Sequence, residues 1–301
     1  SLEKEIHKLA GKEFNISSPK QVSETLFDVL KLDGGKLRHT EGGAISTDAR
    51  ELAKLKDGHP IIAKILEYRE VAKLQGTYID ALPKLIGEDG ALHTTLNQSL
   101  TATGRLSSSD PNLQNIPARG ELGKRIRNAF MARPGYELVS FDYSQIELRV
   151  AAAMSGDEKM KETFLEGGDI HTMTAMEVNN LKTKEEVTPA MRYAAKALNF
   201  GILYGMGPRA FAESAGIPFA DAKKFMQEYF NDFPKIKEFM RRTLENSRKT
   251  GYVETMLGRR RYIPEINSPN FRVRAEAERM AMNAPIQGTA TGDIVKLAMI
   301  S

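Results

Sequence analysis

Residues 188–207 read TPAMRYAAKALNFGILYGMG, and they indicate a helix more clearly than any other stretch of the chain. Thr188 can cap a helix start, and Pro189 suits the first helical position. The glycines at 205 and 207, followed by Pro208, end the pattern. The sequence therefore predicts a helix that begins after Thr188 and ends near Gly205.

One face of this predicted helix carries two cations and then an aromatic ring. Arg192, Lys196 and Phe200 are four residues apart, and because four residues overshoot a turn by roughly 40°, the three stay within an arc of about 80°. Tyr204 extends the stripe by one turn. Clustered cations suit a triphosphate and an aromatic surface suits a base. The spacing alone is equally compatible with two solvated cations beside an ordinary core phenylalanine.

The same stretch resembles the fingers-helix motif of DNA polymerase family A, the DNA polymerase I family. The pattern of that motif is Arg-x3-Lys-x3-Phe/Tyr-Gly-x2-Tyr-Gly, which stands here as Arg192, Lys196, Phe200-Gly201 and Tyr204-Gly205. The resemblance implies that Arg192 and Lys196 hold the triphosphate of an incoming deoxynucleotide (dNTP). It also implies that Phe200 stacks near the base and sugar and that Tyr204 guards the templating position.

A candidate metal ligand lies in residues 137–149, ELVSFDYSQIELR. The apolar run before Asp142 predicts a strand, with a helix after it. Mg²⁺ takes oxygen ligands and keeps several waters, so Asp142 and the carbonyl of Tyr143 suit it, although an aspartate at such a junction is more commonly a turn residue. The stretch closely resembles the first palm motif of the family. The resemblance implies that Asp142 binds both catalytic metals and that Gln145 belongs to the dNTP site.

Glu147 has two interpretations. Ser144 and Glu147 have the spacing of a capping box, in which the serine caps the helix and the glutamate reaches back to the serine amide. In the family, the glutamate at this position packs where a ribose 2′-hydroxyl would lie, so the resemblance implies that Glu147 excludes ribonucleotides. The two roles are compatible.

Residues 101–117, TATGRLSSSDPNLQNIP, are rich in turn-forming residues and indicate a loop. The run is nearly identical to a family segment that follows the primer and template backbones. The resemblance implies that Arg105 contacts the minor groove beside the primer end and that Asn115 binds DNA. Three basic residues follow that suit phosphates or, more commonly, a solvated surface, namely Lys124, Arg125 and Arg127.

Near the C-terminal end, residues 277–300 read AERMAMNAPIQGTATGDIVKLAMI, in which Arg279, Asn283 and Gln287 step by four. Pro285 is expected to kink or end the helix between them. Amide side chains can read minor-groove acceptors, which are similar at every base pair. Structural amides at a kinked helix are the other interpretation. The family has the same series, so the resemblance implies contacts with template and primer.

Two smaller matches keep the same register. Residues 169–172, Asp-Ile-His-Thr, resemble a family segment whose histidine reaches the incoming phosphates, although a lone histidine is more often structural. His171 is therefore a candidate for the dNTP site. Residues 258–262, Gly-Arg-Arg-Arg-Tyr, follow a basic stretch, which is usually only a solvated surface. Because it adjoins groups expected to meet DNA, Arg260 is assigned to the template strand.

Composition is compatible with these assignments. At 301 residues, with 41% apolar and 27% charged residues, the chain is typical of a soluble globular protein and is not a disordered one. A net charge of +4 and a pI near 9.0 allow local polyanion binding. The absence of cysteine excludes disulfides and thiolate chemistry. No apolar run is long enough to span a membrane, and we expect a cytoplasmic monomer, associated with the nucleoid if bacterial.

By resemblance, the chain is expected to contain a helical thumb whose Gly-rich interruption at residues 32–49 grips duplex DNA. The tip contacts expected there are Lys36, Arg38, Ser46 and Thr47. The predicted division is a thumb at 1–93, a first part of the palm at 94–155, fingers at 156–262, and a second part of the palm at 263–301.

One departure from the family pattern concerns the metals. Family members follow the Gln-Gly-Thr-Ala helix by a hairpin bearing His-Asp-Glu, and this chain contains no such motif before Ser301. Two Mg²⁺ ions, or Mn²⁺ in their place, need at least two carboxylates, so Asp142 alone is expected to bind the pair poorly. Asp293 is the nearest spare carboxylate, but it replaces no family ligand. Both termini resemble cut points.

These patterns together predict an α+β fold with the right-hand polymerase architecture of thumb, fingers and an incomplete palm with an antiparallel sheet. The expected activity is template-directed addition of dNMP to a primer 3′-hydroxyl by two-metal phosphoryl transfer, with primer-template DNA and dNTPs as partners. Two alternatives remain open: a catalytically inactive duplex-binding module, and a single-subunit RNA polymerase. Glu147 and the loop at Arg105 favour deoxynucleotides over the second alternative.

Overall fold

The structure is a computed structural model that describes residues 1–35, 37–40, 42–118 and 120–301. The chain divides into two compact units. The first comprises Ser1–Thr95 with Ser108–Leu138, and the second Leu96–Ser107 with Val139–Ser301. The chain passes between them within two short strands, β1 (Thr95–Asn97) and β2 (Ser107–Ser109), and once more after Leu138. The division into thumb, palm and fingers stays a prediction.

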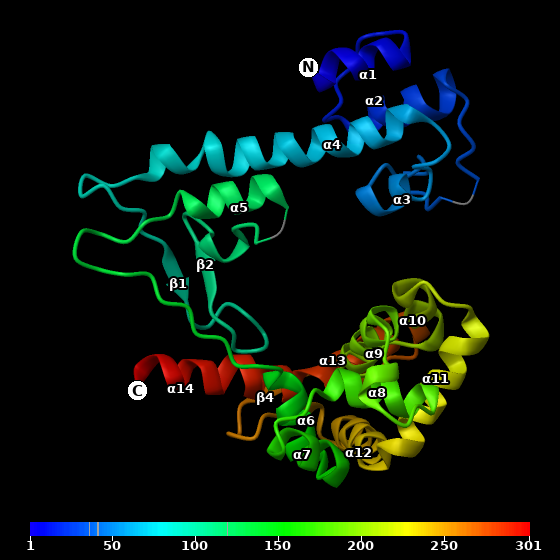
Figure 1. Cartoon of the computed structure of the whole chain (residues 1–301), viewed down its shortest axis with the longest axis vertical. Helices are drawn as coiled ribbons and strands as arrows, with labels where there is room; N and C mark the ends of the chain where they lie inside the picture. The colour runs from blue at the N-terminus through cyan, green and yellow to red at the C-terminus, as the bar shows by residue number, and fades with distance from the viewer. Residues whose placement is uncertain (36, 41, 119) are drawn as a thin grey trace. The chain divides into compact units, whose positions relative to one another are not determined.

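The first unit is helical and is built on the long helix α4 (Figure 1). His59 caps α4 and a proline occupies its first turn. Ile61, Ile62 and Ile65 of α4 are fully buried against α1 and the segments near it. The elements of this unit are α1 (Leu2–Ala10), α2 (Pro19–Ser23), η1 (Glu24–Val29), α3 (Ala49–Ala53), α4 (Pro60–Leu74), η2 (Gln75–Ile79), η3 (Leu82–Leu85), η4 (Leu113–Asn115) and α5 (Glu121–Asn128).

The Gly-rich interruption between η1 and α3 is irregular in its described residues, as expected, apart from one bridge between His39 and Ile45. Lys36 lies outside the described residues. The expected tip contacts at Ser46 and Thr47 are wrong for this conformation, because both residues are buried. The Ser46 hydroxyl donates to Asp48 at 3.1 Å and so helps to position the residue that caps α3.

The second unit packs helices around one large apolar core and a small hairpin around a second core. Strands β3 and β4 are antiparallel, with Val253 opposite Arg261. Its elements are α6 (Ile146–Ser155), α7 (Glu158–Leu165), α8 (Ile170–Asn179), η5 (Lys184–Glu186), α9 (Pro189–Leu203), α10 (Pro208–Ala215), α11 (Phe219–Asp232), α12 (Pro234–Thr250), β3 (Tyr252–Glu254), β4 (Arg260–Tyr262), η6 (Pro264–Asn267), α13 (Phe271–Gln287), η7 (Gly288–Ile294) and α14 (Val295–Ile300).

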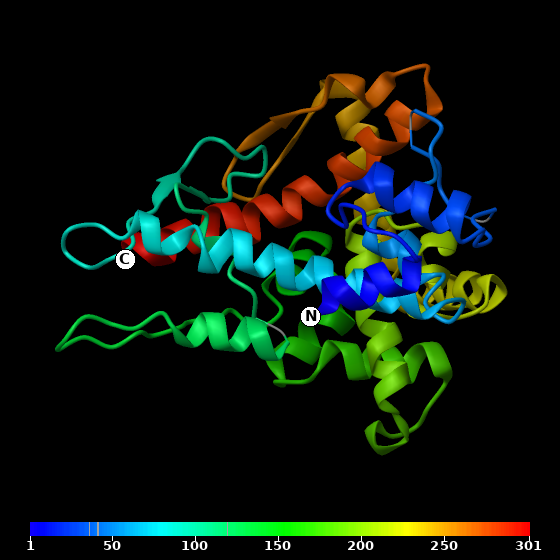
Figure 2. The same ribbon diagram turned by 90° about the horizontal axis from the view of Figure 1, so that it is seen from above.

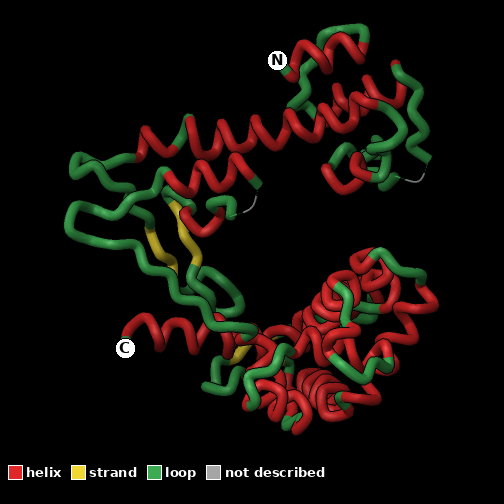
Figure 3. Tube along the Cα trace, in the orientation of Figure 1, coloured by secondary structure: helices red, strands yellow, loops and turns green. Residues whose placement is uncertain are grey.

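The expected α+β class is confirmed, with far more helix than sheet (Figure 3). No helix among the described residues is both long and apolar enough to cross a lipid bilayer.

The strand predicted before Asp142 is wrong. The segment between α5 and α6 is loop throughout (Figure 3). Leu138, Val139 and Phe141 are 70%, 68% and 94% exposed. A strand exists only when a neighbouring strand takes up its backbone hydrogen bonds, and none of the described segments pairs with this one.

The helix that carries Pro285 does not end there. α13 continues to Gln287 and passes through the wider turns of η7 into α14 (Figure 2). Proline lacks the amide that would complete the usual i to i−4 bond, and wider turns close behind such a position accommodate the loss. Arg279, Asn283 and Gln287 therefore lie on one helix.

Tyr229 offers a stability test within the core of the second unit. Its side chain is fully buried, burial raises its pKa, and its hydroxyl has no hydrogen-bond partner among the described residues. Tyr229→Phe is therefore expected to increase the free energy of unfolding by about 1 kcal/mol, because it removes a buried polar group without a partner. Urea unfolding should show a higher midpoint with an unchanged m-value. A loss of similar size would mean that the hydroxyl is hydrogen-bonded.

Candidate active site

The predicted nucleotide helix is α9, and its ends are those expected. The Thr188 side chain accepts a hydrogen bond from the Met191 amide at 3.2 Å, and Pro189 is the first helical residue. The helix ends at Leu203, and Gly205 takes a left-handed φ of 67°. Ala195, Leu198 and Ile202 are buried on one side. Another side carries the exposed Arg192 and Lys196, and Phe200, further along that side, is half-buried.

Arg192 already has an anionic partner. Its Nε donates to the Asp169 carboxylate at 2.7 Å. Asp169 also caps α8, accepting from the His171 amide at 3.1 Å. Partial burial acts to raise the pKa of Asp169, but the hydrogen bonds and the charge of Arg192 outweigh it and hold that pKa below its ordinary value. Lys196, one turn further along α9, forms no ion pair with any carboxylate of the described residues.

His171 lies under this face rather than on it. Its ring is 3% exposed, lies 5.7 Å from the Phe200 ring, and shares a 3.1 Å hydrogen bond through Nδ1 with the buried Asn199 amide. Burial lowers the pKa of His171 to about 4, and the charges of Arg192 and Lys196 act in the same direction. The ring is therefore neutral at pH 7. A role at the phosphates would have to be that of a neutral donor.

The interpretation of Glu147 as half of a capping box is wrong. The residue before α6 is Gln145, in the left-handed region with a φ of 55°, and neither it nor Ser144 caps the helix. The Ser144 carbonyl instead accepts from Arg149 Nε at 3.0 Å. This geometry turns Glu147 inward, away from the Ser144 amide. The Oε1 atom of Gln145 is buried and has no partner within the described part of the chain.

Glu147 is the buried centre of a partly exposed hydrogen-bonded network. Its Oε2 accepts from the Tyr204 hydroxyl at 2.6 Å, and its Oε1 accepts from Arg105 Nη2 at 3.2 Å. The Glu147 side chain is only 10% exposed, whereas the Arg105 side chain is 44% exposed. Burial, and then the hydrogen bond to Glu147, raise the pKa of Tyr204, so its hydroxyl remains a donor at any physiological pH. The network joins the end of α9, the start of α6 and the loop at 101–107.

The end of α9 also lies directly against α13. A Cβ on Gly205 would lie 2.9 Å from Cγ of Arg279 and 2.5 Å from Cε of Met282. Only glycine fits there, and its position places Tyr204 beside the helix that carries the predicted minor-groove series. Arg279 is exposed, and Asn283 and Gln287 are half-buried.

Asp142 and Tyr143 lie on the exposed loop before α6. No group of three or more histidine, cysteine, aspartate or glutamate side chains that could hold a metal ion is found in residues 1–35, 37–40, 42–118 and 120–301. One carboxylate and one carbonyl supply only part of the oxygen shell of a divalent ion. These residues do not account for a two-ion site, and Asp142 supplies the one candidate carboxylate in the described part of this loop, beside the Tyr143 carbonyl.

The other predicted DNA contacts have hydrogen-bond partners outside this network. Arg260 on β4 is exposed, donates to Glu254 at 2.6 Å, and has its guanidinium carbon 4.6 Å from the Tyr252 ring centre. Asn115 and Arg38 belong to the first unit. Asn115 is exposed and accepts from the Tyr78 hydroxyl through its carbonyl, while Arg38 donates to Asp48 at 3.0 Å.

The sequence model of DNA polymerase family A matches residues 1–301. The chain belongs to this family. The thermostable DNA polymerase I of Thermus aquaticus is 52% identical over 301 residues, which are 99% of this chain and 36% of that protein. The DNA polymerase I of Lactococcus lactis subsp. lactis (strain IL1403) is 51% identical over 302 residues, which are 100% of this chain and 34% of that protein. The chain thus spans about a third of the curated relatives it matches.

A solved structure agrees with the fold. It is the POL domain of Pol1 from M. smegmatis in complex with DNA primer-template and dNTP. It matches with a TM-score of 0.90 and 42% identity, over 99% of this chain and 52% of that chain. The predicted family and architecture of the chain are therefore confirmed.

Two residues of this candidate site are not singled out by the sequence. Asp169 has no predicted role of its own within the Asp-Ile-His-Thr motif, yet an aspartate before Ile-His-Thr is a helix-cap signal that places its carboxylate near the next helix face. Thr291, whose Oγ1 accepts from Arg105 Nε at 2.6 Å, lies 186 residues from its partner, and no local signal indicates that contact.

Buried, neutral His171 predicts an acid-dependent loss of stability in this family A chain. The unfolded chain takes up this proton near the ordinary pKa of 6.5, whereas the folded chain does so only near 4. Neutral His171 therefore makes its full contribution to the free energy of unfolding above pH 6.5. This contribution, about 3 kcal/mol in total, is lost as pH falls to 4. Urea unfolding at a series of pH values should show a shallower dependence for His171→Gln over this window. Equal slopes would contradict a neutral buried ring.

Proposed function

We propose that this chain carries the nucleotide-selecting and duplex-binding machinery of a DNA-directed DNA polymerase, which adds dNMP to a primer 3′-hydroxyl. The observation that supports this most strongly is that α9 carries both the cationic face of Arg192 and Lys196 and, at its end, the Tyr204 hydroxyl that binds the buried Glu147 carboxylate. The first suits a triphosphate, and the second adjoins the end of the same helix, where the sugar and base of that nucleotide would lie.

The reaction needs negative charge to be stabilised at the triphosphate during in-line attack on the α-phosphate. Lys196 is exposed and without an ion-pair partner in the described chain, so its ammonium is available to the phosphates and to the leaving pyrophosphate, to which it donates a proton. Arg192 offers a second cation once it leaves Asp169. Phe200 supplies the aromatic surface.

A bound divalent cation, Mg²⁺ or Mn²⁺, would supply Lewis-acid stabilisation, with Asp142 and the Tyr143 carbonyl as its candidate ligands. The chain's own contribution is orientation. Glu147, held by Arg105 and Tyr204, fills the space beside the sugar, and its buried carboxylate disfavours an added 2′-hydroxyl. Four side chains are proposed to contact the minor groove of the duplex, namely Arg105, Arg279, Asn283 and Gln287. The remaining predicted contacts are proposed to meet the DNA strands elsewhere, and they are Arg260, Arg38, Asn115 and the undescribed Lys36.

A second candidate function is duplex binding without nucleotide addition. It is favoured by the lone Asp142, since no cluster of three metal-binding side chains exists in the described residues. Both functions share the same duplex contacts and differ only in chemistry.

Primer extension with Mg²⁺ and four dNTPs, together with a fluorescence titration of the same primer-template, separates the two. Extension that is lost in Asp142→Ala supports the polymerase function. Tight, salt-sensitive binding without extension supports the second candidate. Preferential incorporation of NTPs would instead indicate an RNA polymerase, and absence of duplex binding would contradict all three.

A further inference from the structure

A carboxylate that plays no part in the proposed reaction is buried where three segments of the second unit meet. Asp293 lies in η7 with a side chain that is 5% exposed. It accepts from Arg259 Nε at 2.8 Å and from the Thr255 hydroxyl at 2.7 Å. Both donors lie at the turn of the β3–β4 hairpin. A buried carboxylate requires such partners, so its position and that of the hairpin turn depend on each other.

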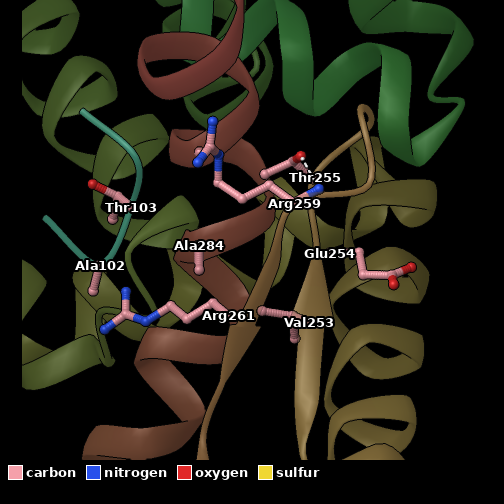
Figure 4. A pocket seen from close by; sticks show the side chains of 9 residues that line it. Ala102, Thr103, Val253, Glu254, Thr255, Arg259, Arg261 and Ala284 are labelled. Carbon is pink, nitrogen blue, oxygen red and sulfur yellow. Dashed lines mark hydrogen bonds between the residues drawn. The ribbon is translucent and has the colours of Figure 1, made fainter. Parts of the chain in front are cut away.

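The third segment is the loop that carries Gly104. A Cβ on Gly104, whose φ is 78°, would lie 2.8 Å from Arg259 Nε. A Cβ on Gly292 would lie 2.6 Å from the Thr103 carbonyl oxygen, and one on Gly288 would lie 2.7 Å from the Thr255 methyl group. Figure 4 shows Arg259 extending from the hairpin toward the loop that carries Ala102 and Thr103. The Arg259 side chain thus forms the surface on which this loop rests.

Arg105 follows directly on that loop, and its head group is held at both ends. Its Nε donates to the Thr291 hydroxyl at 2.6 Å, two residues before Asp293, and its Nη2 donates to Glu147. The carbonyl of Arg105 accepts from the Thr101 hydroxyl at 2.7 Å. A continuous series of neighbouring residues therefore connects Asp293 to the Glu147 network. It consists of Arg259, the loop at Gly104 and Arg105, whose Nη2 donates to Glu147.

We propose that Asp293, acting through Arg259, is a positioning residue for nucleotide sugar selection. The pair of Asp293 and Arg259 determines the position of the 101–105 loop. The loop in turn positions the Arg105 guanidinium, and the guanidinium fixes the side-chain rotamer of Glu147. This inference rests on the proposed function, because it assumes that Glu147 faces the sugar. Asp293 itself touches neither nucleotide nor duplex.

The test measures equilibrium binding of a dNTP and of the matching NTP to the complex of this chain with primer-template, whose primer ends in a dideoxynucleotide so that no turnover is needed. Asp293→Asn is expected to lower the ratio of the NTP Kd to the dNTP Kd by about tenfold, because Glu147 loses its fixed position. General loosening of the fold would weaken both nucleotides equally and leave the ratio unchanged. Gly104→Ala displaces Arg259 from the other side and is expected to act in the same direction if Asp293→Asn does not fold.

The matched control is Glu177→Gln, which breaks another ion pair of the same unit, 2.7 Å from Lys159, that touches none of these residues. It is expected to leave the ratio unchanged. In a Glu147→Ala background, Asp293→Asn should have no further effect on the ratio, because its action passes through Glu147. An unchanged ratio in both Asp293→Asn and Gly104→Ala, or additive effects in the double variant, would overturn the positioning role.

Failure of the proposed function gives a different pattern. If Glu147→Ala leaves the ratio unaltered, or if the chain binds no nucleotide, the proposed function fails and the positioning role fails with it. If Glu147→Ala lowers the ratio while Asp293→Asn and Gly104→Ala do not, only the positioning role is lost.

Discussion

Replacement of Lys196 by alanine is expected to slow primer extension by about 100- to 1,000-fold, which is the range for removing one preorganised charge from a phosphoryl-transfer or acyl-transfer site. The side chain is exposed on α9, and no carboxylate of the described residues competes for it, so its whole charge is available to the triphosphate. The Kd for primer-template is expected to change by less than about twofold, because Lys196 is proposed to contact the nucleotide phosphates rather than the duplex, and one exposed cation contributes little to binding.

Single-turnover extension at saturating dNTP, with a parallel fluorescence titration of the duplex, measures both quantities. Lys223→Ala is the control, because Lys223 is an exposed lysine on α11 with no proposed role, and its removal should change neither. Equal losses of rate and duplex affinity in Lys196→Ala would show that Lys196 binds the duplex rather than the reacting phosphates.

Replacement of Glu147 by alanine is expected to lower the preference for dNTP over NTP by about 100-fold, measured as the ratio of kcat/KM values or, without turnover, of Kd values. The reason is structural. Tyr204 and Arg105 hold the carboxylate in one place. A 2′-hydroxyl would therefore either clash with the side chain or face carboxylate oxygens that already accept hydrogen bonds from these two residues. Truncation opens the space and removes that obstacle.

Glu147→Gln distinguishes size from charge. The amide keeps the volume but accepts less strongly from Arg105, so most of the preference should survive if sterics dominate. Arg105→Lys complements it, because lysine has a single side-chain nitrogen and cannot place donors at both the Nε position beside Thr291 and the Nη2 position beside Glu147. A preference that survives Glu147→Ala would show that another group excludes the 2′-hydroxyl.

Local signals predicted the helices well and the site only in part. The ends of α9 follow from Thr188, Pro189 and Gly205, because capping acts within a few residues. The strand before Asp142 could not be judged locally, since a strand depends on a distant partner. Glu147 shows the same contrast between a local sequence signal and contacts that depend on distant residues. Its spacing from Ser144 fits a capping box, but contacts 42 and 57 residues away in the chain determine its conformation.

The position of Arg192 could be predicted, but its partner could not. Helical spacing placed it on the cationic face, and the Asp169 contact depends on how α8 packs against α9. Residues joined only by the fold, such as Asp293 and Arg259 or Arg105 and Thr291, give no periodic or motif signal for their contact.

Under the proposed function, the ion pair between Arg192 and Asp169 makes nucleotide capture an exchange reaction rather than a simple addition. The guanidinium must release one anion to accept another, so the measured affinity for a nucleotide is a difference between two attractions. Because both side chains are partly exposed, the pair contributes no more than about 1 kcal/mol, and apparent affinity falls only several-fold. A ligand with little negative charge gains almost nothing from the exchange, whereas a triphosphate outcompetes a single carboxylate. A ligand must therefore carry more negative charge than the Asp169 carboxylate offers before Arg192 leaves that ion pair to bind it.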